Sequence, residues 1–351
     1  MTGCHSQEPA TKVQMTHLEG LKSEYPYAAR NVTVTGARMS YLDEGSGEVV
    51  LFVHGNPTWS FAWRRFFPEI TRTRRAVAVD HIGCGLSDKP LDYDYSLEQR
   101  ITALCEFITQ LDLKRITLVA HDWGGAIGMG AAARLPERFS RFVLMNTGAF
   151  TCTRMPLRIA VCRFPFLGTL ALRGFNAFSR AALTMAVAKP ERMTRAVRQG
   201  YLAPYNSWRN RVAVNAFVKD IPLRPSHRSW STLLAVEEGL SQFEAHPMLL
   251  LWGQRDWCFT TDFLNEFEQR YPQAETLRIP DAGHYVFEDA HEQIIPRLIT
   301  FLEDHPLGNP LWTVRVVPST EGGLCMAGSD RSITLLVAAA LVAVDCLRRT
   351  L

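Results

Sequence analysis

Short apolar runs recur along the chain at intervals that leave room for a helix between most of them. From residue 49 onward the runs are continuous rather than alternating, which is typical of strands buried on both faces of a parallel sheet. The first two runs are joined by a turn that contains glycine, which predicts an antiparallel hairpin. We expect an α/β fold with an eight-stranded, mostly parallel sheet, formed by Asn31–Thr35, Arg38–Asp43, Val49–Val53, Ala76–Asp80, Ile116–Ala120, Phe142–Met145, Met248–Trp252 and Thr276–Ile279.

The strand rhythm stops between Phe150 and His227, where the pattern predicts several helices and no strong strand. An insertion after the sixth strand would lie over the carboxyl-terminal edge of the sheet as a cap and supply the walls of a pocket. We therefore predict a main domain of residues 25–149 and 228–306, with a helical cap at 150–227. Residues 1–24 would form an N-terminal extension.

Residues 307–351 form a C-terminal extension of different composition, whose role the sequence leaves open. Gly308–Asp330 is rich in Gly, Pro, Ser and Thr, as linkers are, and is followed by the apolar run Ile333–Val344. That run has 12 residues, whereas a helix needs about 20 apolar residues to span a bilayer. We expect no transmembrane span, and either a weakly ordered extension or a helix through which copies of the chain oligomerise.

Composition narrows the class of protein further. The chain has 351 residues, 47% of them hydrophobic, and a net charge of +3 with dispersed Lys and Arg, which argues against nucleic-acid binding. Its eight cysteines are scattered without metal-ligand spacing, as reduced thiols are. The polar segment Met1–Gly20 lacks the apolar core of a secretory signal. These features predict a cytoplasmic enzyme without a metal ion.

Asp122 carries the most specific chemical signal. It follows the apolar strand Ile116–Ala120 and precedes Gly124, Gly125 and a run of small residues. Such a sharp strand–turn–helix connection exposes a nucleophile at the edge of a sheet. A carboxylate there can displace a leaving group from saturated carbon and form an ester. The alternative is that Asp122 simply caps the following helix.

Three further loops follow predicted strands and would meet Asp122 at the same sheet edge. They contain Asn56, Asp256 and His284, so that nucleophile, acid and histidine follow one another along the chain. His284 would deprotonate water for hydrolysis of an ester, and Asp256 would orient the imidazole. Asn56 and Trp123 each offer an uncharged side-chain N–H donor for an expelled anion. Surface, turn and packing roles are the alternatives for these four residues.

These motifs resemble those of the haloalkane dehalogenases, which have the α/β-hydrolase fold. The resemblance covers roughly residues 25–302 and rests on His54–Pro57, Asp80–Pro90 and His121–Gly125. It implies Asp122 as nucleophile, His284 as base, Asp256 as acid, Asn56 and Trp123 as halide-stabilising residues, and no cofactor. The Asn/Trp pair and the acid position resemble the third subfamily, which overlaps with the β-lactone decarboxylases of olefin biosynthesis.

Four functions follow, in this order. The first is displacement of halide from a small apolar haloalkane by Asp122, followed by attack of water that gives an alcohol and a halide ion. The second is decarboxylation of a β-lactone to an alkene and CO2. The third is epoxide hydrolysis, for which Tyr201 and Tyr205 are available to protonate the epoxide oxygen. The fourth is a role in assembly through the segment that begins at Gly308.

Overall fold

The computed structural model of the chain describes residues 21–308 and two short pairs, 317–318 and 324–325. It divides into one unit up to His305 and a second from Pro306. In the second unit, strand β9 (Val317–Pro318) pairs antiparallel with β10 (Leu324–Cys325). The apolar run Ile333–Val344 lies outside the described residues, so oligomerisation through it stays a prediction. No helix in the described ranges has the length and apolarity needed to cross a bilayer.

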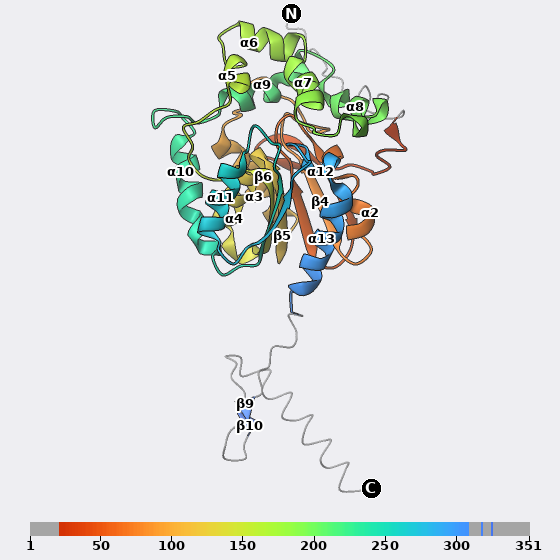
Figure 1. Ribbon diagram of the computed structural model, residues 1–351, viewed down its shortest axis with the longest axis vertical. Helices are drawn as coiled ribbons and strands as arrows, with labels where there is room; N and C mark the ends of the chain where they lie inside the picture. Colours follow the sequence, from red (N-terminus) through yellow and green to blue (C-terminus); the bar gives the residue numbers. More distant parts are fainter. Residues whose placement is uncertain (1–20, 309–316, 319–323, 326–351) are drawn as a thin grey trace, which may run out of the picture. The chain divides into compact units, whose positions relative to one another are not determined.

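An eight-stranded sheet forms the centre of the first unit (Figure 1). Its strand order is β1-β2-β4-β3-β5-β6-β7-β8, with β2 antiparallel to both neighbours and every other pair parallel. This confirms the predicted hairpin and the mostly parallel sheet. The strands are β1 (Arg30–Val34), β2 (Ala37–Gly45), β3 (Val49–Val53), β4 (Arg75–Asp80), β5 (Ile116–Asp122), β6 (Phe139–Thr147), β7 (Met248–Gly253) and β8 (Glu275–Ile279).

Strand β6 begins three residues before its predicted start at Phe142, because a buried arginine takes part in it. The Arg141 guanidinium is held by the Thr117 hydroxyl at 2.9 Å, by Glu48 at 2.6 Å and by backbone carbonyls of Leu302 and His305. These partners satisfy a charge that would otherwise be costly to bury. A prediction based on apolar runs cannot anticipate such a strand start.

Helices cover both faces of the sheet, and alternate residues of β3 show how. Leu51 and Val53 belong to the apolar cluster under α3, α4 and α11, whereas Val50 and Phe52 belong to the cluster under α2 and α13. Both sets are fully buried, which explains why this strand is apolar at every position. The helices and 3₁₀ turns around the sheet are η2 (Ser60–Trp63), α2 (Phe67–Ile70), α3 (Leu97–Gln110), α4 (Trp123–Arg134), η3 (Pro136–Arg138), α10 (Trp230–Gly239), η8 (Leu240–Phe243), α11 (Thr261–Arg270), α12 (Val286–Asp289) and α13 (His291–Asp304).

The chain between β6 and β7 forms the helical insertion that the sequence predicts after the sixth strand, and Figure 1 shows it above the end of the sheet. Helix α10 already packs with α3 and α4 of the main domain, through Leu233 and Val236. We therefore propose residues 150–227 as the bounds of this cap. Its elements are α5 (Leu157–Val161), α6 (Leu167–Thr169), η4 (Leu170–Gly174, a π-helical turn), α7 (Ala177–Met185), η5 (Pro190–Arg192), α8 (Arg195–Leu202), η6 (Ala203–Tyr205), η7 (Arg209–Arg211) and α9 (Val212–Lys219).

Candidate active site

Asp122 stands at the turn where β5 ends and α4 begins. Its backbone has φ 54° and ψ −128°, a conformation that costs a non-glycine residue about 1–3 kcal/mol. The side chain makes no hydrogen bond that caps α4, so Asp122 is not an ordinary helix cap. Its Oδ1 instead accepts a hydrogen bond of 2.6 Å from the backbone N–H of Asn56. The strained turn therefore directs the carboxylate toward the loop that follows β3.

Two glycines allow that loop and the turn to approach so closely. A Cβ on Gly55 would lie 2.0 Å from Oδ1 of Asp122, and one on Gly124 would lie 2.2 Å from the carbonyl oxygen of Val53. Neither position has room for any side chain. The glycines seen in the sequence on both sides of this site are thus required by close backbone packing.

His284 lies between two carboxylates. Its Nδ1 is 2.8 Å from Oδ2 of Asp256, and its Nε2 is 3.6 Å from Oδ2 of Asp122. The side chains of all three residues are at most 8% exposed. They come from the ends of β5, β7 and β8, so the structure brings together the three residues that the sequence analysis grouped.

Burial and charge set the protonation of this group. Burial raises the pKa of the Asp122 carboxyl, against the opposing effects of His284 and of the backbone N–H groups of Trp123 and Asn56. Burial alone would lower the pKa of His284, but the carboxylates of Asp256 and Asp122 outweigh it and raise that pKa above its ordinary value. The imidazole therefore stays protonated to a higher pH than a free histidine does.

Asn56 and Trp123 line the same cavity as Asp122 and His284. The Asn56 amide donates a long hydrogen bond of 3.3 Å to the carbonyl oxygen of Val214, and its Oδ1 has no partner among the described residues. The Trp123 ring packs on Phe217, with ring centroids 5.3 Å apart. That these two side chains converge on a leaving group stays a prediction.

Asn146, at the end of β6, belongs to this site although the sequence analysis did not single it out. Its Nδ2 lies 3.0 Å from Oδ2 of Asp256 and 3.0 Å from the carbonyl oxygen of Gly253. Its Oδ1 accepts the Gly253 N–H at 2.8 Å. The sequence pattern could have predicted Asn146, because it directly follows a predicted buried strand and therefore lies at the same sheet edge as Asp122, Asp256 and His284. Phe259, which stacks on the His284 ring at 5.7 Å, has no comparable signal.

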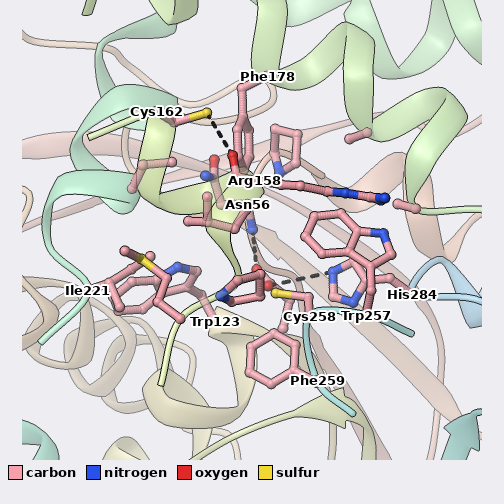
Figure 2. A pocket seen from close by; sticks show the side chains of 18 of the residues that line it. Asn56, Trp123, Arg158, Cys162, Phe178, Ile221, Trp257, Cys258, Phe259 and His284 are labelled. Carbon is pink, nitrogen blue, oxygen red and sulfur yellow. Dashed lines mark hydrogen bonds and ion pairs between the residues drawn. The ribbon is translucent and has the colours of Figure 1, made fainter. Parts of the chain in front are cut away.

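A cavity of about 310 Å³ extends from these residues into the cap. Figure 2 shows Trp123, Cys258 and His284 at one end, and Phe178 and Cys162 at the other. Apart from the reactive group and the arginines Arg154 and Arg158, most of the lining is apolar. The arrangement suits an uncharged, apolar molecule.

The two tyrosines weighed for epoxide hydrolysis lie outside this lining. The Tyr201 hydroxyl lies 2.5 Å from Oε1 of Glu288, and the Tyr205 hydroxyl donates to the carbonyl oxygen of Thr58 at 3.0 Å. Both side chains are buried elsewhere in the molecule. Neither tyrosine is therefore placed to protonate an epoxide held at Asp122.

Comparisons with known proteins find relatives of two kinds. The chain is 42% identical over 285 residues to a cis-3-alkyl-4-alkyloxetan-2-one decarboxylase of Shewanella oneidensis, covering 80% of this chain and 89% of that protein. It is 42% identical over 297 residues to the protein of the same name in Xanthomonas campestris, covering 81% and 98%. The crystal structure of the haloalkane dehalogenase DatA from Agrobacterium tumefaciens matches with a TM-score of 0.72 at 26% identity, covering 80% and 97%.

A family model for the alpha/beta hydrolase fold matches residues 48–291, well over half of the chain. That range includes Asp122, Asp256 and His284. The decarboxylases and the dehalogenase are thus sequence and structural relatives within one larger family. The chain belongs to the alpha/beta hydrolase family.

Proposed function

We propose that the chain is a β-lactone decarboxylase, which converts an oxetan-2-one with two alkyl substituents into an alkene and CO2. The observation that carries this proposal is the 42% identity to two cis-3-alkyl-4-alkyloxetan-2-one decarboxylases, over about four fifths of the chain. The apolar cavity above Asp122 supports it, because two alkyl chains need such walls.

The reaction proceeds in two steps that need no oxidant and no water. In the first, an oxygen of the Asp122 carboxylate attacks the saturated ring carbon C4, which carries one alkyl chain, and the bond between C4 and the ring oxygen breaks. The product is an alkyl ester of Asp122 with a free carboxylate on the neighbouring carbon. In the second, the bond to this carboxylate breaks, its electron pair forms the carbon–carbon double bond, and the Asp122 carboxylate leaves. Back-side attack followed by anti elimination retains the cis arrangement of the alkyl chains.

The surrounding residues stabilise the negative charge that moves between the two carboxylates. His284, kept protonated by Asp256, lies 3.6 Å from the Asp122 oxygen and would stabilise that carboxylate as it leaves. Asn56 and Trp123 would donate N–H groups to the carboxylate released from the ring. Asn146 fixes the position of Asp256 and acts only through it. We also propose that the reaction takes place in the cytoplasm, since the scattered cysteines fit a reducing compartment.

Haloalkane dehalogenation, which was the first expectation from the sequence, is now the second candidate function. The Asn56/Trp123 pair and the likeness to the dehalogenase structure favour it. In that reaction, His284 in its neutral form activates water, which attacks the carbonyl carbon of the Asp122 ester. The higher identity to the decarboxylases, 42% against 26%, leads us to place decarboxylation first.

A single labelling experiment separates the two functions. The purified chain is given a cis-dialkyl β-lactone or a haloalkane of similar length in H₂¹⁸O, and the products and the peptide that contains Asp122 are analysed by mass spectrometry. For decarboxylation we expect alkene and CO2 from the lactone, with no ¹⁸O in Asp122. Halide release from the haloalkane with ¹⁸O in Asp122, and no alkene from the lactone, would reverse the order of the two functions.

A further inference from the structure

The outer side of the cap carries an unusual concentration of exposed apolar side chains. Seven of the eleven large hydrophobic residues that are exposed in the described part of the chain lie between residues 157 and 175, with 49% to 88% of each residue exposed. Patches of this kind mark interaction surfaces, because isolated exposed apolar residues do not cluster. We call them the apolar cap surface: Leu157, Val161, Phe164, Phe166, Leu167, Leu170 and Phe175.

These residues lie on consecutive short elements that pack on one another. Helix α6 lies so close to the end of α5 that a Cβ on Gly168 would be 2.2 Å from the carbonyl oxygen of Cys162. Figure 1 shows α5 and α6 at the end of the first unit that is remote from β5 and α13. The apolar cap surface is therefore an accessible outer face of the unit.

The cap also has a large excess of basic over acidic residues, unlike the rest of the chain. Residues 150–227 contain 13 Lys and Arg against two acidic residues, whereas the rest of the chain contains 25 against 33. The segment 151–190, which includes the apolar cap surface, has five arginines and no acidic residue. Arg163 and Arg173 donate to backbone carbonyls rather than to carboxylates, and Arg180 is exposed. Exposed aromatic and aliphatic side chains in a segment that is rich in arginine and lacks acidic residues are typical of a surface that binds anionic lipid.

The same elements of the cap, α5 and η4, contribute residues both to the apolar cap surface and to the lining of the cavity. In α5, Ile159 faces the cavity whereas Leu157 and Val161 are exposed, and in η4 Leu172 faces the cavity whereas Leu170 is exposed. An apolar molecule dissolved in a bilayer would therefore need to pass only these elements to reach Asp122.

We propose that the apolar cap surface docks on a bilayer that contains anionic phospholipid, and that the enzyme receives its substrate from that bilayer. A second copy of the chain is a poor occupant, because two strongly basic caps repel each other. An acidic protein would satisfy the charge, but a lipid surface satisfies both the charge and the uncharged, apolar nature of the substrate. The inference rests on the proposed function only for the class of substrate.

Vesicle sedimentation with the full chain tests the docking directly. The vesicles consist either of phosphatidylcholine alone or of phosphatidylcholine mixed with phosphatidylglycerol, at low and high salt. We expect binding to the mixed vesicles, weakened by salt, and little binding to phosphatidylcholine alone. No binding to the mixed vesicles, or equal binding to both kinds, would overturn the proposal.

Two variants with matched controls locate the surface. Phe166→Glu, at a residue 88% exposed, and Arg180→Glu should each lower the partition coefficient for mixed vesicles by about tenfold. Leu91→Glu and Arg72→Glu make the same charge changes at exposed positions outside the cap and should leave it unchanged. An equal loss in variants and controls would show that only net charge matters, against the proposal. None of these four residues lines the cavity.

Three further measurements distinguish lipid docking from binding of a second copy or of an acidic protein, and from failure of the proposed function. Light scattering that gave a dimer which Phe166→Glu dissociates would assign the surface to a second copy and refute lipid docking. Binding to soluble polyglutamate without binding to mixed vesicles would assign it to an acidic protein and refute it as well. Turnover of a short, water-soluble β-lactone should be the same in the chain and in Phe166→Glu. Lactone turnover that is absent from both, with vesicle binding intact, would refute the proposed function while supporting the docking.

Discussion

The edge of the sheet and the cap meet at one cavity, but they are built in opposite ways. At the sheet edge, Asp122, Asp256 and His284 are buried, and His284 lies 2.8 Å from Asp256 and 3.6 Å from Asp122. A backbone N–H group holds Asp122, and Asn146 holds Asp256. The cap presents apolar side chains on both of its sides and carries many positive charges, of which Arg154 and Arg158 line the cavity. Under the proposed function, the sheet edge would supply the reactive groups and the cap would select the molecule that reaches them.

Replacing the carboxylate at the sheet edge should have the largest effect. Asp122→Ala removes the group that forms the ester, and we expect alkene formation to fall by about 10⁴-fold or more. Gas chromatography of the alkene measures the loss, and circular dichroism checks that the variant is folded. Residual activity within tenfold of the unchanged chain would mean that Asp122 is not the nucleophile.

His284→Ala should have the next largest effect, about 10²–10⁴-fold. Because His284 is proposed to stabilise the Asp122 carboxylate as it leaves, we expect the alkyl ester to accumulate in this variant and to decay slowly to alkene without taking up oxygen from water. Mass spectrometry of the intact protein after mixing with substrate checks this point. Decay of the adduct to a hydroxy acid, with ¹⁸O from labelled water in Asp122, would instead indicate a hydrolytic second step, as in dehalogenation.

As the pH rises through the pKa of His284, activity should fall for decarboxylation and rise for dehalogenation. Protonated His284 supports decarboxylation, so activity should be high below its raised pKa and should fall as the pH rises through it. Loss of activity in acid follows protonation of Asp122, whose pKa is raised by burial. Asp256→Asn removes the larger of the two charge effects on His284, lowers its pKa and should move the alkaline limb to lower pH.

The measurement is kcat/KM for one lactone across the pH range, in the unchanged chain and in Asp256→Asn. Lys114→Gln, which alters an exposed ion pair with Asp112, serves as the control whose profile should not move. Activity that rises with pH through the histidine limb would show that the neutral imidazole is the active form, as water activation requires.

A change in the cap should have the smallest effect and should change selectivity rather than chemistry. Leu172 is 1% exposed and lines the cavity, so Leu172→Ala enlarges the apolar space beside the substrate. We expect the ratio of kcat/KM between long-chain and short-chain lactones to change by roughly threefold to tenfold. Competition between two lactones, followed by gas chromatography, measures the ratio directly. An unchanged ratio with a uniformly lower rate would mean that the cap does not select the chain.

The sheet edge could be predicted from the sequence far better than the cap. Continuous apolar runs give the strands, and polar residues that directly follow them, such as Asp122 and His284, give the grouping of the site. The same logic would have found Asn146 had it been applied to β6. A strand that contains buried Arg141 breaks the pattern, because its charge is satisfied by partners distant in sequence.

The cap resists prediction for a physical reason. Its helices are short and apolar on both sides, so periodicity does not tell which side faces the cavity: Ile159 is buried there while Val161 is exposed. The direction of each side chain depends on packing with residues far along the chain, such as Val218.

Product release meets the same apolar walls as substrate entry. A halide ion formed at Asp122 would have to pass Phe259, Trp257 and the apolar cap lining, where Arg154 and Arg158 would replace part of the hydration that it loses. An alkene and CO2 carry no charge and need no such compensation. A hydrocarbon product would therefore leave this cavity without the two arginines, whereas an ionic product would depend on them.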